Sequence, residues 1–371
     1  MSGPLAGKRI IEVGGIGPGP FCGMLLADMG ADVVRIEAPA AHAGSKLFPL
    51  FNTPCDVLDR GKRALRLDLK VEADRATLLA LAGGTDGLIE GFRPGVMERL
   101  GLGPEVCRAV NPRLVYGRMS GFGQSGPLRD TAGHDINYIA LAGALHSIGP
   151  AGGAPTIPLN LVGDFGGGGL LLAFAMVCAM LEAGTSGQGQ VIDAAMSEGA
   201  ALLMAAVYGY RAAGMMPGPR GQNAFDGGAH FYAVYECADG QFLAVGALEP
   251  PFYATLLERC GIADPEFRRQ FDAKSWPALK AKLAALFKTR TRADWLARLE
   301  GSDACVTPVL SVDEAPDHAQ NRAREAFVEL ASVTQPAPAP RFERTRPEVR
   351  WPAPARPVEA AALLQQWSQP S

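Results

Sequence analysis

The sequence predicts an α/β protein in which a large domain with a Rossmann-like parallel sheet is joined to a smaller α+β domain. Three observations lead to this prediction. The chain opens with the alternation strand, Gly/Pro loop, helix and strand, which is typical of a βαβ unit. Residues 230–247 alternate as a β-hairpin does. The 371 residues, of which 48% are hydrophobic, suffice for two or three domains at about 150 residues each.

The opening βαβ unit is predicted as a strand at residues 9–13, a loop at 14–20, a helix at 21–29 and a strand at 31–37. Further strands are expected at residues 87–89 and 114–118. The dinucleotide fingerprint G-x-G-x-x-G is absent, because counting from Gly15 puts Pro20 in the third place and counting from Gly17 puts Cys22 there. The sheet is therefore predicted without a nicotinamide site.

The domain boundaries follow from changes in pattern along the chain. Residues 1–185 are expected to form the large domain, 186–227 linker helices and 228–330 the small domain, with 331–371 packing back on the large one. Asp193 is predicted to cap the helix that follows it, and Asp239-Gly240 to turn the hairpin. Helices are expected at 276–287 and 292–299. Seven prolines between Thr334 and Pro357 predict an extended chain there.

Composition excludes several classes of protein. A net charge of −3 gives no footprint for nucleic acid or an anionic membrane surface. The seven cysteines show no C-x-x-C spacing, so neither a zinc site nor a disulfide framework is predicted. The longest apolar stretch, residues 166–181, is shorter than a membrane span of about 20 residues and is expected to be a core helix. The ends of the sequence show no targeting signal, and we expect a cytoplasmic protein.

Asp164 is the first candidate for chemistry, because it stands before an apolar helix that begins with four glycines. An aspartate there is as readily a helix cap. The glycines indicate a backbone that something approaches closely, and free N–H groups at a helix start can receive negative charge such as an enolate oxygen. We expect the amides of Asp164 and Phe165 to do so, and Asn160 to orient the Asp164 carboxylate.

The segment GHDINY is the second candidate. A histidine beside an aspartate is more often a local hydrogen-bonding pair, but His134 is one of five histidines in the chain and suits proton transfer near neutral pH. Tyr138 in the same segment is expected to support it. Glu249, followed by two prolines, is a loop acid that the prolines would hold in place.

The third set consists of basic residues that could hold phosphate groups, although most surface lysines and arginines bind nothing in particular. These are Arg35, Arg60, Lys62, Arg63, Arg93 and Arg99.

A series of longer segments runs in a consistent order from about residue 4 to residue 345. They are IGPGP, GADVVRIE, EGFRPGVMERLGLG, SGFGQSGP, GHDINY, NLVGDFGGG, GQGQVIDAAM, YECADGQFLAVGALEP and DACVTPVL. Together they resemble the α-methylacyl-CoA racemases of the class III CoA-transferase superfamily. One departure is VVRIEAP, in which Ala38 stands where the family pattern leads us to expect a basic residue that contacts CoA.

The resemblance implies two interlocked chains forming an obligate homodimer, with each active site between subunits. It implies that His134 and Asp164 lie on an acyl-CoA substrate, with Glu249 of the partner chain near the histidine. CoA would contact Ile16 and the basic residues named above. Neither a metal nor a separate cofactor is implied, since CoA is part of the substrate.

The expected reaction is racemisation of a 2-methylacyl-CoA by proton transfer through an enolate, with His134 and Asp164 as the acid/base pair. Three alternatives stay open. The first is a CoA transferase in which Asp164 is the nucleophile. The second is an isomerase of another acyl-CoA with the same machinery, and the third is a protein that binds acyl-CoA without catalysis.

Overall fold

The computed structural model describes residues 3–39 and 50–368, and the chain divides into two compact units. The larger unit comprises Met1–Ala142, Leu159–Leu203 and Ala319–Ser371, and the smaller comprises Gly143–Pro158 and Met204–His318. This division differs from the predicted one. Residues 186–203 fold with the larger unit and residues 204–227 with the smaller, so the segment expected to be a linker is divided between them. Residues 143–158, predicted in the large domain, fold with the smaller unit, and residues 319–330, predicted in the small domain, fold with the larger.

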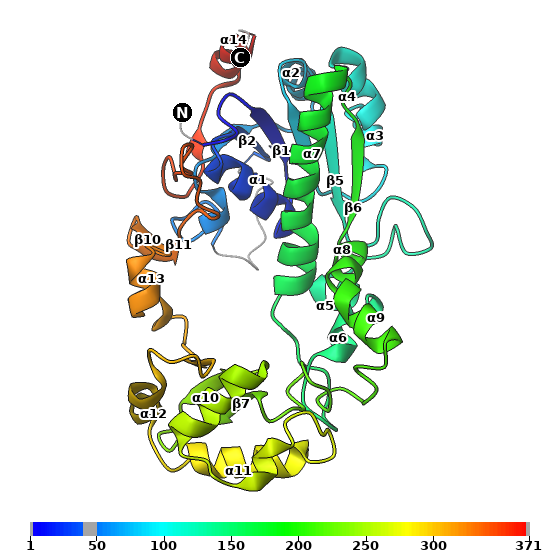
Figure 1. Cartoon of the computed structure of the whole chain (residues 1–371). Coiled ribbons are helices and arrows are strands. Elements are labelled where there is room, and N and C mark those ends of the chain that lie inside the picture. Colours follow the sequence, from blue (N-terminus) through cyan, green and yellow to red (C-terminus); the bar gives the residue numbers. More distant parts are fainter. Residues whose placement is uncertain (1–2, 40–49, 369–371) are drawn as a thin grey trace. The chain divides into compact units, whose positions relative to one another are not determined.

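A seven-stranded parallel sheet forms the centre of the larger unit (Figure 1). Its strands are β1 (Arg9–Val13), β2 (Asp32–Glu37), β3 (Arg63–Arg66), β4 (Gly87–Glu90), β5 (Val115–Ser120), β6 (Val191–Ala195) and β12 (Arg356–Pro357). Their spatial order, β12-β3-β2-β1-β4-β5-β6, contains the doubly wound order of a Rossmann sheet. The four strands predicted from the sequence are confirmed, whereas β3, β6 and β12 were not predicted.

Helices cover both faces of this sheet. They are α1 (Pro18–Asp28), α2 (Glu72–Ala82), α3 (Val96–Arg99), α4 (Pro104–Val110), α5 (Asp135–Leu141), the π-helix η2 (Leu161–Leu170), α7 (Leu171–Ser186) and α8 (Met196–Leu203). Alternate residues of a strand point to opposite faces. Ile10 of β1 therefore packs with α1 and α7, while Ile11 packs with α2, α4 and the C-terminal helix α14 (Ala360–Trp367).

Asp193 occupies a different place from the predicted one. It lies within β6 and not at a helix start, and its carboxylate accepts the backbone N–H of Gln124 at 3.0 Å. The helix begins at Met196, after the strand. Asp193 lies in a strand and does not cap the helix, because the segment VIDAA pairs with β5 and extends the parallel sheet.

One helix, Leu161–Ser186, is long and apolar enough to cross a membrane by length and composition alone. Its buried side chains, among them Leu172 and Met176, are fully enclosed against the sheet, and a Cβ on Gly117 of β5 would lie 2.8 Å from the Met176 sulfur. One face of this helix packs on the sheet, as predicted for a core helix, but the opposite face exposes Leu170, Phe174 and Leu181.

The smaller unit is built around a three-stranded antiparallel sheet of β7 (Tyr232–Glu236), β8 (Phe242–Gly246) and β9 (Val306–Pro308). Its helices are α6 (Ala144–Ser147), α9 (Ala205–Ala212), α10 (Pro250–Cys260), α11 (Trp276–Phe287) and α12 (Arg292–Leu299). The predicted hairpin is confirmed, since Gly240 adopts a φ of 76° in its turn. The predicted bounds of α11 and α12 are also confirmed. Phe231, Phe287 and Trp295 form an aromatic core between sheet and helices.

Short elements complete the chain. They are the 3-10 helices η1 (Val57–Asp59), η3 (Pro265–Arg268) and η4 (Ala315–Asp317), the helix α13 (Ala319–Ala323) and the hairpin of β10 (Phe327–Leu330) and β11 (Val333–Pro336).

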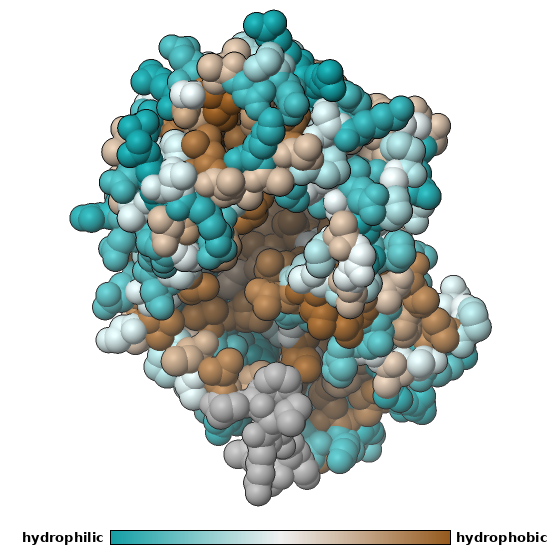
Figure 2. Space-filling view, turned by 90° about the horizontal axis from the view of Figure 1, so that it is seen from below, coloured by the Kyte–Doolittle hydropathy of each residue, from teal (hydrophilic) through white to brown (hydrophobic). Residues whose placement is uncertain are grey.

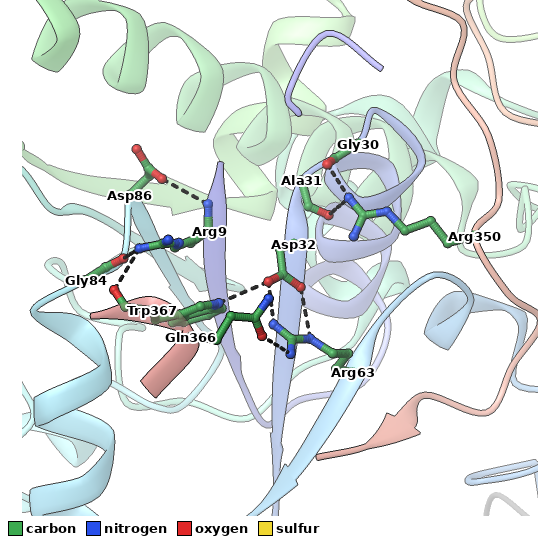
Figure 3. A network of polar contacts seen from close by, with 10 residues as sticks. All are labelled: Arg9, Gly30, Ala31, Asp32, Arg63, Gly84, Asp86, Arg350, Gln366 and Trp367. Atoms are coloured by element: carbon green, nitrogen blue, oxygen red, sulfur yellow. Dashed lines mark hydrogen bonds and ion pairs between the residues drawn. The ribbon is translucent and has the colours of Figure 1, made fainter. Parts of the chain in front are cut away.

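A polar network fastens the C-terminal helix α14 to the larger unit (Figure 3). The Trp367 indole donates to Asp32 Oδ2 at 3.0 Å, and Arg9 Nη1 donates to the Trp367 carbonyl at 2.7 Å. Arg63 donates to Asp32 and lies 6.0 Å over the Trp367 ring. Trp367 is only 3% exposed. The proline-rich stretch therefore ends in a docked helix that the sequence did not predict.

We expect Trp367→Ala to lower the free energy of unfolding by about 3–5 kcal/mol, because it leaves a cavity and removes a hydrogen bond. The neighbouring exposed residue gives the control, and Gln366→Ala is expected to cost less than about 1 kcal/mol. Denaturant unfolding of both variants measures the difference. Equal losses would show that α14 does not depend on the indole.

Candidate active site

A cavity of about 380 Å³ opens at the carboxyl ends of β1, β4 and β5 in the larger unit. Gly15 and Ile16 follow β1, Phe92 and Arg93 follow β4, and Gly121 follows β5. The strand order reverses between β1 and β4, and ligands of open α/β sheets bind at such a switch point. The cavity therefore lies where this fold places its ligand.

Five of the predicted site residues line this cavity: Ile16, Arg93, His134, Tyr138 and Asp164. They come from four different segments of the chain. The structure thus brings the two groups expected to move protons, His134 and Asp164, into one cavity.

His134 is held by the start of α5, which it immediately precedes. Its backbone N–H donates to Asn137 Oδ1 at 3.0 Å, and its side chain is exposed to the cavity. Tyr138 holds Gly133, the residue before His134, because its hydroxyl donates to the Gly133 carbonyl. The ring fits so closely that a Cβ on Gly121 would lie 2.2 Å from it. The supporting role expected of Tyr138 therefore has a structural basis.

Asp164 lies in the first turn of the π-helix η2 and is half-buried. Burial raises the pKa of its carboxyl above the ordinary value. The hydrogen bond from Asn160, at 3.2 Å, and the charge of His134 act in the opposite direction, while the charge of Asp135 adds to the rise. A carboxyl so placed accepts a proton more readily than one in water.

The predicted oxyanion amides have other partners. The Asp164 N–H donates to Asp135 Oδ2 at 2.7 Å, and the Phe165 N–H donates to the Asn160 carbonyl at 3.3 Å. Within the described part of the chain, the N–H groups of Asp135 and Ile136 at the start of α5 have no acceptor. The N–H groups left without an acceptor are thus those next to His134, although neither residue is among those that line the cavity.

The four glycines of η2 pack closely against the protein itself. A Cβ on Gly167 would lie 2.6 Å from the Ala200 nitrogen of α8, and one on Gly169 would lie 2.5 Å from the Pro18 oxygen of α1. In return, a Cβ on Gly199 would lie 1.8 Å from the Gly167 oxygen. The close approach inferred from the sequence exists, but neighbouring helices make it.

Three of the basic residues expected to contact CoA are committed to buried ion pairs. Lys62 Nζ lies 2.7 Å from Glu12 Oε2, and neither side chain is exposed. Arg60 makes a two-point contact with Asp28 at 3.1 and 2.6 Å. Arg35 pairs with Asp59. Lys62 also donates to the Pro20 carbonyl, so this cluster supports the Gly/Pro loop beside the cavity.

A second cavity, also of about 380 Å³, opens at the carboxyl ends of β1, β2 and β3. Phe92 lines both cavities, so the two are neighbours. Val13, Ile36 and Leu67 give it apolar walls, and Lys70 adds a positive charge. Ala38 lines this cavity as well, so the position where a basic residue was expected does face a cavity. Phe92 and Lys70 were not predicted from the sequence as lining residues.

Apart from Arg93, the remaining predicted residues do not line these cavities, and Arg63 pairs with Asp32. Arg93 is exposed and lines the first cavity, whereas Arg99 is exposed at the end of α3. Glu249 is exposed at the N-cap of α10 in the smaller unit, where burial and, after it, the charge of Glu249 raise the pKa of the Cys305 thiol. Across residues 3–39 and 50–368, no group of three or more His, Cys, Asp or Glu side chains could hold a metal ion.

Comparison with known proteins gives a consistent result. The family described as CoA-transferase family III matches residues 5–356. The chain is 47% identical to the alpha-methylacyl-CoA racemase of Mus musculus, over 92% of this chain and 87% of that protein. It is 46% identical to the human alpha-methylacyl-CoA racemase, over 91% and 86%. A solved CAIB/BAIF family protein from Brucella suis matches with a TM-score of 0.84 at 25% identity, covering 99% of this chain and all of that one.

We expect Arg60→Ala to lower the free energy of unfolding by about 3–5 kcal/mol, because Asp28 is then left buried and unpaired. Arg93→Ala removes an exposed arginine and is expected to change it by less than about 0.5 kcal/mol. Chemical denaturation distinguishes the two positions. An Arg60→Ala protein as stable as the wild type would contradict the structural role given to this ion pair.

Proposed function

The chain belongs to CoA-transferase family III, and on that premise we propose that it is an enzyme that interconverts the two epimers of 2-methylacyl-CoA thioesters. The observation that carries the proposal is that His134 and Asp164 line one cavity at the switch point of the sheet. Its relatives in mouse and human, which are named alpha-methylacyl-CoA racemases, support the substrate class.

Racemisation requires a base on one face of the α-carbon and an acid on the other. His134 removes the proton from one epimer while protonated Asp164 delivers a proton to the opposite face, and the roles reverse for the other epimer. The raised pKa of Asp164 suits this exchange, because the carboxyl must be able to hold a proton. One of the two groups must carry the transferable proton while the other lacks it, so the rate is expected to have a bell-shaped pH dependence.

The negative charge of the intermediate develops on the thioester oxygen. The N–H groups of Asp135 and Ile136 support a place for this oxygen at the start of α5, beside His134. This assignment replaces the amides of Asp164 and Phe165.

The CoA part of the substrate is expected to extend from the first cavity into the second. The apolar walls there suit an adenine ring, and Lys70 and Arg93, which line the two cavities, suit phosphate groups. Ile16 lines the first cavity, on the loop after β1. Proton transfer of this kind requires neither a metal nor a separate cofactor.

We also propose that the enzyme acts as an interlocked homodimer in the cytoplasm. Leu170, Phe174, Val177 and Leu181 form an exposed stripe along η2 and α7, at the spacing of one helix face. Figure 2 shows hydrophobic residues in continuous areas of the exposed surface. Such surface is typical of a protein interface. In the dimer, Glu249 of the partner subunit is expected to orient His134.

The reaction is tested by incubating the protein with a single epimer of a 2-methylacyl-CoA in D2O, without added cofactor or carboxylic acid. We expect α-deuterium incorporation together with loss of stereochemical purity. The absence of both, with CoA transfer to an added carboxylic acid, would favour the transferase alternative.

We expect His134→Ala and Asp164→Asn each to lower the rate of deuterium incorporation by about 10²–10⁴-fold, because each removes one acid/base group. His146→Ala is the control, since His146 lies in the smaller unit and lines a different cavity. It is expected to retain the wild-type rate. A transferase that uses Asp164 as nucleophile would tolerate His134→Ala, and full activity of that variant contradicts the proposed pair.

A further inference from the structure

We propose that Asp135 is a positioning residue of this site: its carboxylate, held between α5 and η2, fixes where Asp164 stands relative to His134 during proton transfer. The inference rests on the proposed racemase function and deepens it. Asp135 reaches the two acid/base residues by different routes, through the chain to His134 and through its side chain to Asp164.

The Asp135 carboxylate is buried and hydrogen-bonded to the backbone next to and at Asp164. Its Oδ2 accepts the N–H of Gly163 at 2.6 Å and that of Asp164 at 2.7 Å. It is 5% exposed, although its immediate neighbours His134 and Ile136 are exposed. Both bonds cross from α5 to η2, and they join Asp135 to residues that lie 28 and 29 positions later in the sequence.

Asp135 packs so closely against η2 that there is no room for a side chain at Gly163. A Cβ on Gly163 would lie 2.6 Å from Asp135 Oδ2, so the residue before Asp164 is restricted to glycine. A carboxylate that only complemented the helix dipole of α5 would need neither burial nor contacts with a second helix. The two crossing bonds therefore indicate that Asp135 holds the backbone that carries the Asp164 side chain.

Asp135 also affects the pKa of Asp164 through its charge. Burial is the main cause of the raised pKa of Asp164, and the nearby negative charge of Asp135 adds to it, because it disfavours the ionised carboxyl. The other titratable or charged side chains that line the cavity are Arg93, Arg129, His134 and Tyr138. Glu198 of the adjacent helix α8 lines a different cavity.

Two substitutions separate position from charge. In Asp135→Asn the amide oxygen still accepts both N–H bonds, but the negative charge is gone. In Asp135→Ala both bonds are lost. The matched control is Asp226→Asn in the smaller unit, because Asp226 also accepts backbone N–H groups, from Gly221 and Asn223, both at 2.8 Å.

The kinetic test measures α-proton exchange in D2O as a function of pH. For Asp135→Ala we expect kcat to fall about 10²-fold while KM changes less than about threefold, because displacement of Asp164 affects the transition state more than binding. For Asp135→Asn we expect most of kcat to be rescued. Its acidic limb should move by up to about 1 pH unit to lower pH, because Asp164 without the neighbouring charge ionises more easily.

Backbone hydrogen exchange gives a readout that requires no turnover. The amides of Gly163 and Asp164 are expected to exchange faster in Asp135→Ala, whereas Asp135→Asn and Asp226→Asn leave them protected. The Asp226→Asn variant is also expected to keep the wild-type pH profile.

The outcomes are distinguishable. An active wild type whose kcat and pH profile are unchanged in both Asp135 variants overturns the inference alone, even if thermal stability falls. A wild type without α-proton exchange overturns the proposed function, and with it the role of Asp135 in that reaction. Unchanged protection of Gly163 and Asp164 in Asp135→Ala contradicts the geometric basis of the inference.

Discussion

The close contact of η2 with α1 and α8 is the constraint on which the site depends. Glycines at 167, 169 and 199 let the three helices approach to distances that a Cβ would prevent. On one side this contact places Asp164 at the Gly/Pro loop after β1, where a Cβ on Gly17 would lie 3.3 Å from its carboxylate. On the other side, Asp135 binds the same turn. A π-helix turn held from both sides presents its carboxyl in a fixed position, as functional sites of this kind require.

The sequence predicted what depends on local pattern. The apolar alternation of Arg9–Val13 and the turn residues Asp239 and Gly240 specify their structure within a few residues, and the fold agrees with both. The bounds of α14 and β6 depend on distant partners. Trp367 is fixed by Asp32, and Asp193 lies in a strand because β5 provides its hydrogen bonds. No window of sequence contains those contacts.

The same distinction applies to the site. His134 and Asp164 could be named because their residue types and settings suit proton transfer, and both line the cavity. Lys62 and Arg60 were predicted to bind phosphate groups, because the sequence shows which residues are charged but not which residues pair with them in the fold. Their partners, Glu12 and Asp28, lie 50 and 32 residues away. The amides of Asp164 and Phe165 were expected to be free for the same reason, because only the fold shows that Asp135 has reached one of them.

The central claim is that the α-carbon of the thioester lies between His134 and Asp164. A crystal structure with a bound 2-methylacyl-CoA tests it most directly. The account predicts a His134 ring nitrogen and an Asp164 carboxylate oxygen within about 3.5 Å of the α-carbon on opposite faces, with the thioester oxygen toward the start of α5. A carboxylate of Asp164 directed at the thioester carbonyl carbon, with His134 remote from the α-carbon, would contradict the account and identify Asp164 as a nucleophile.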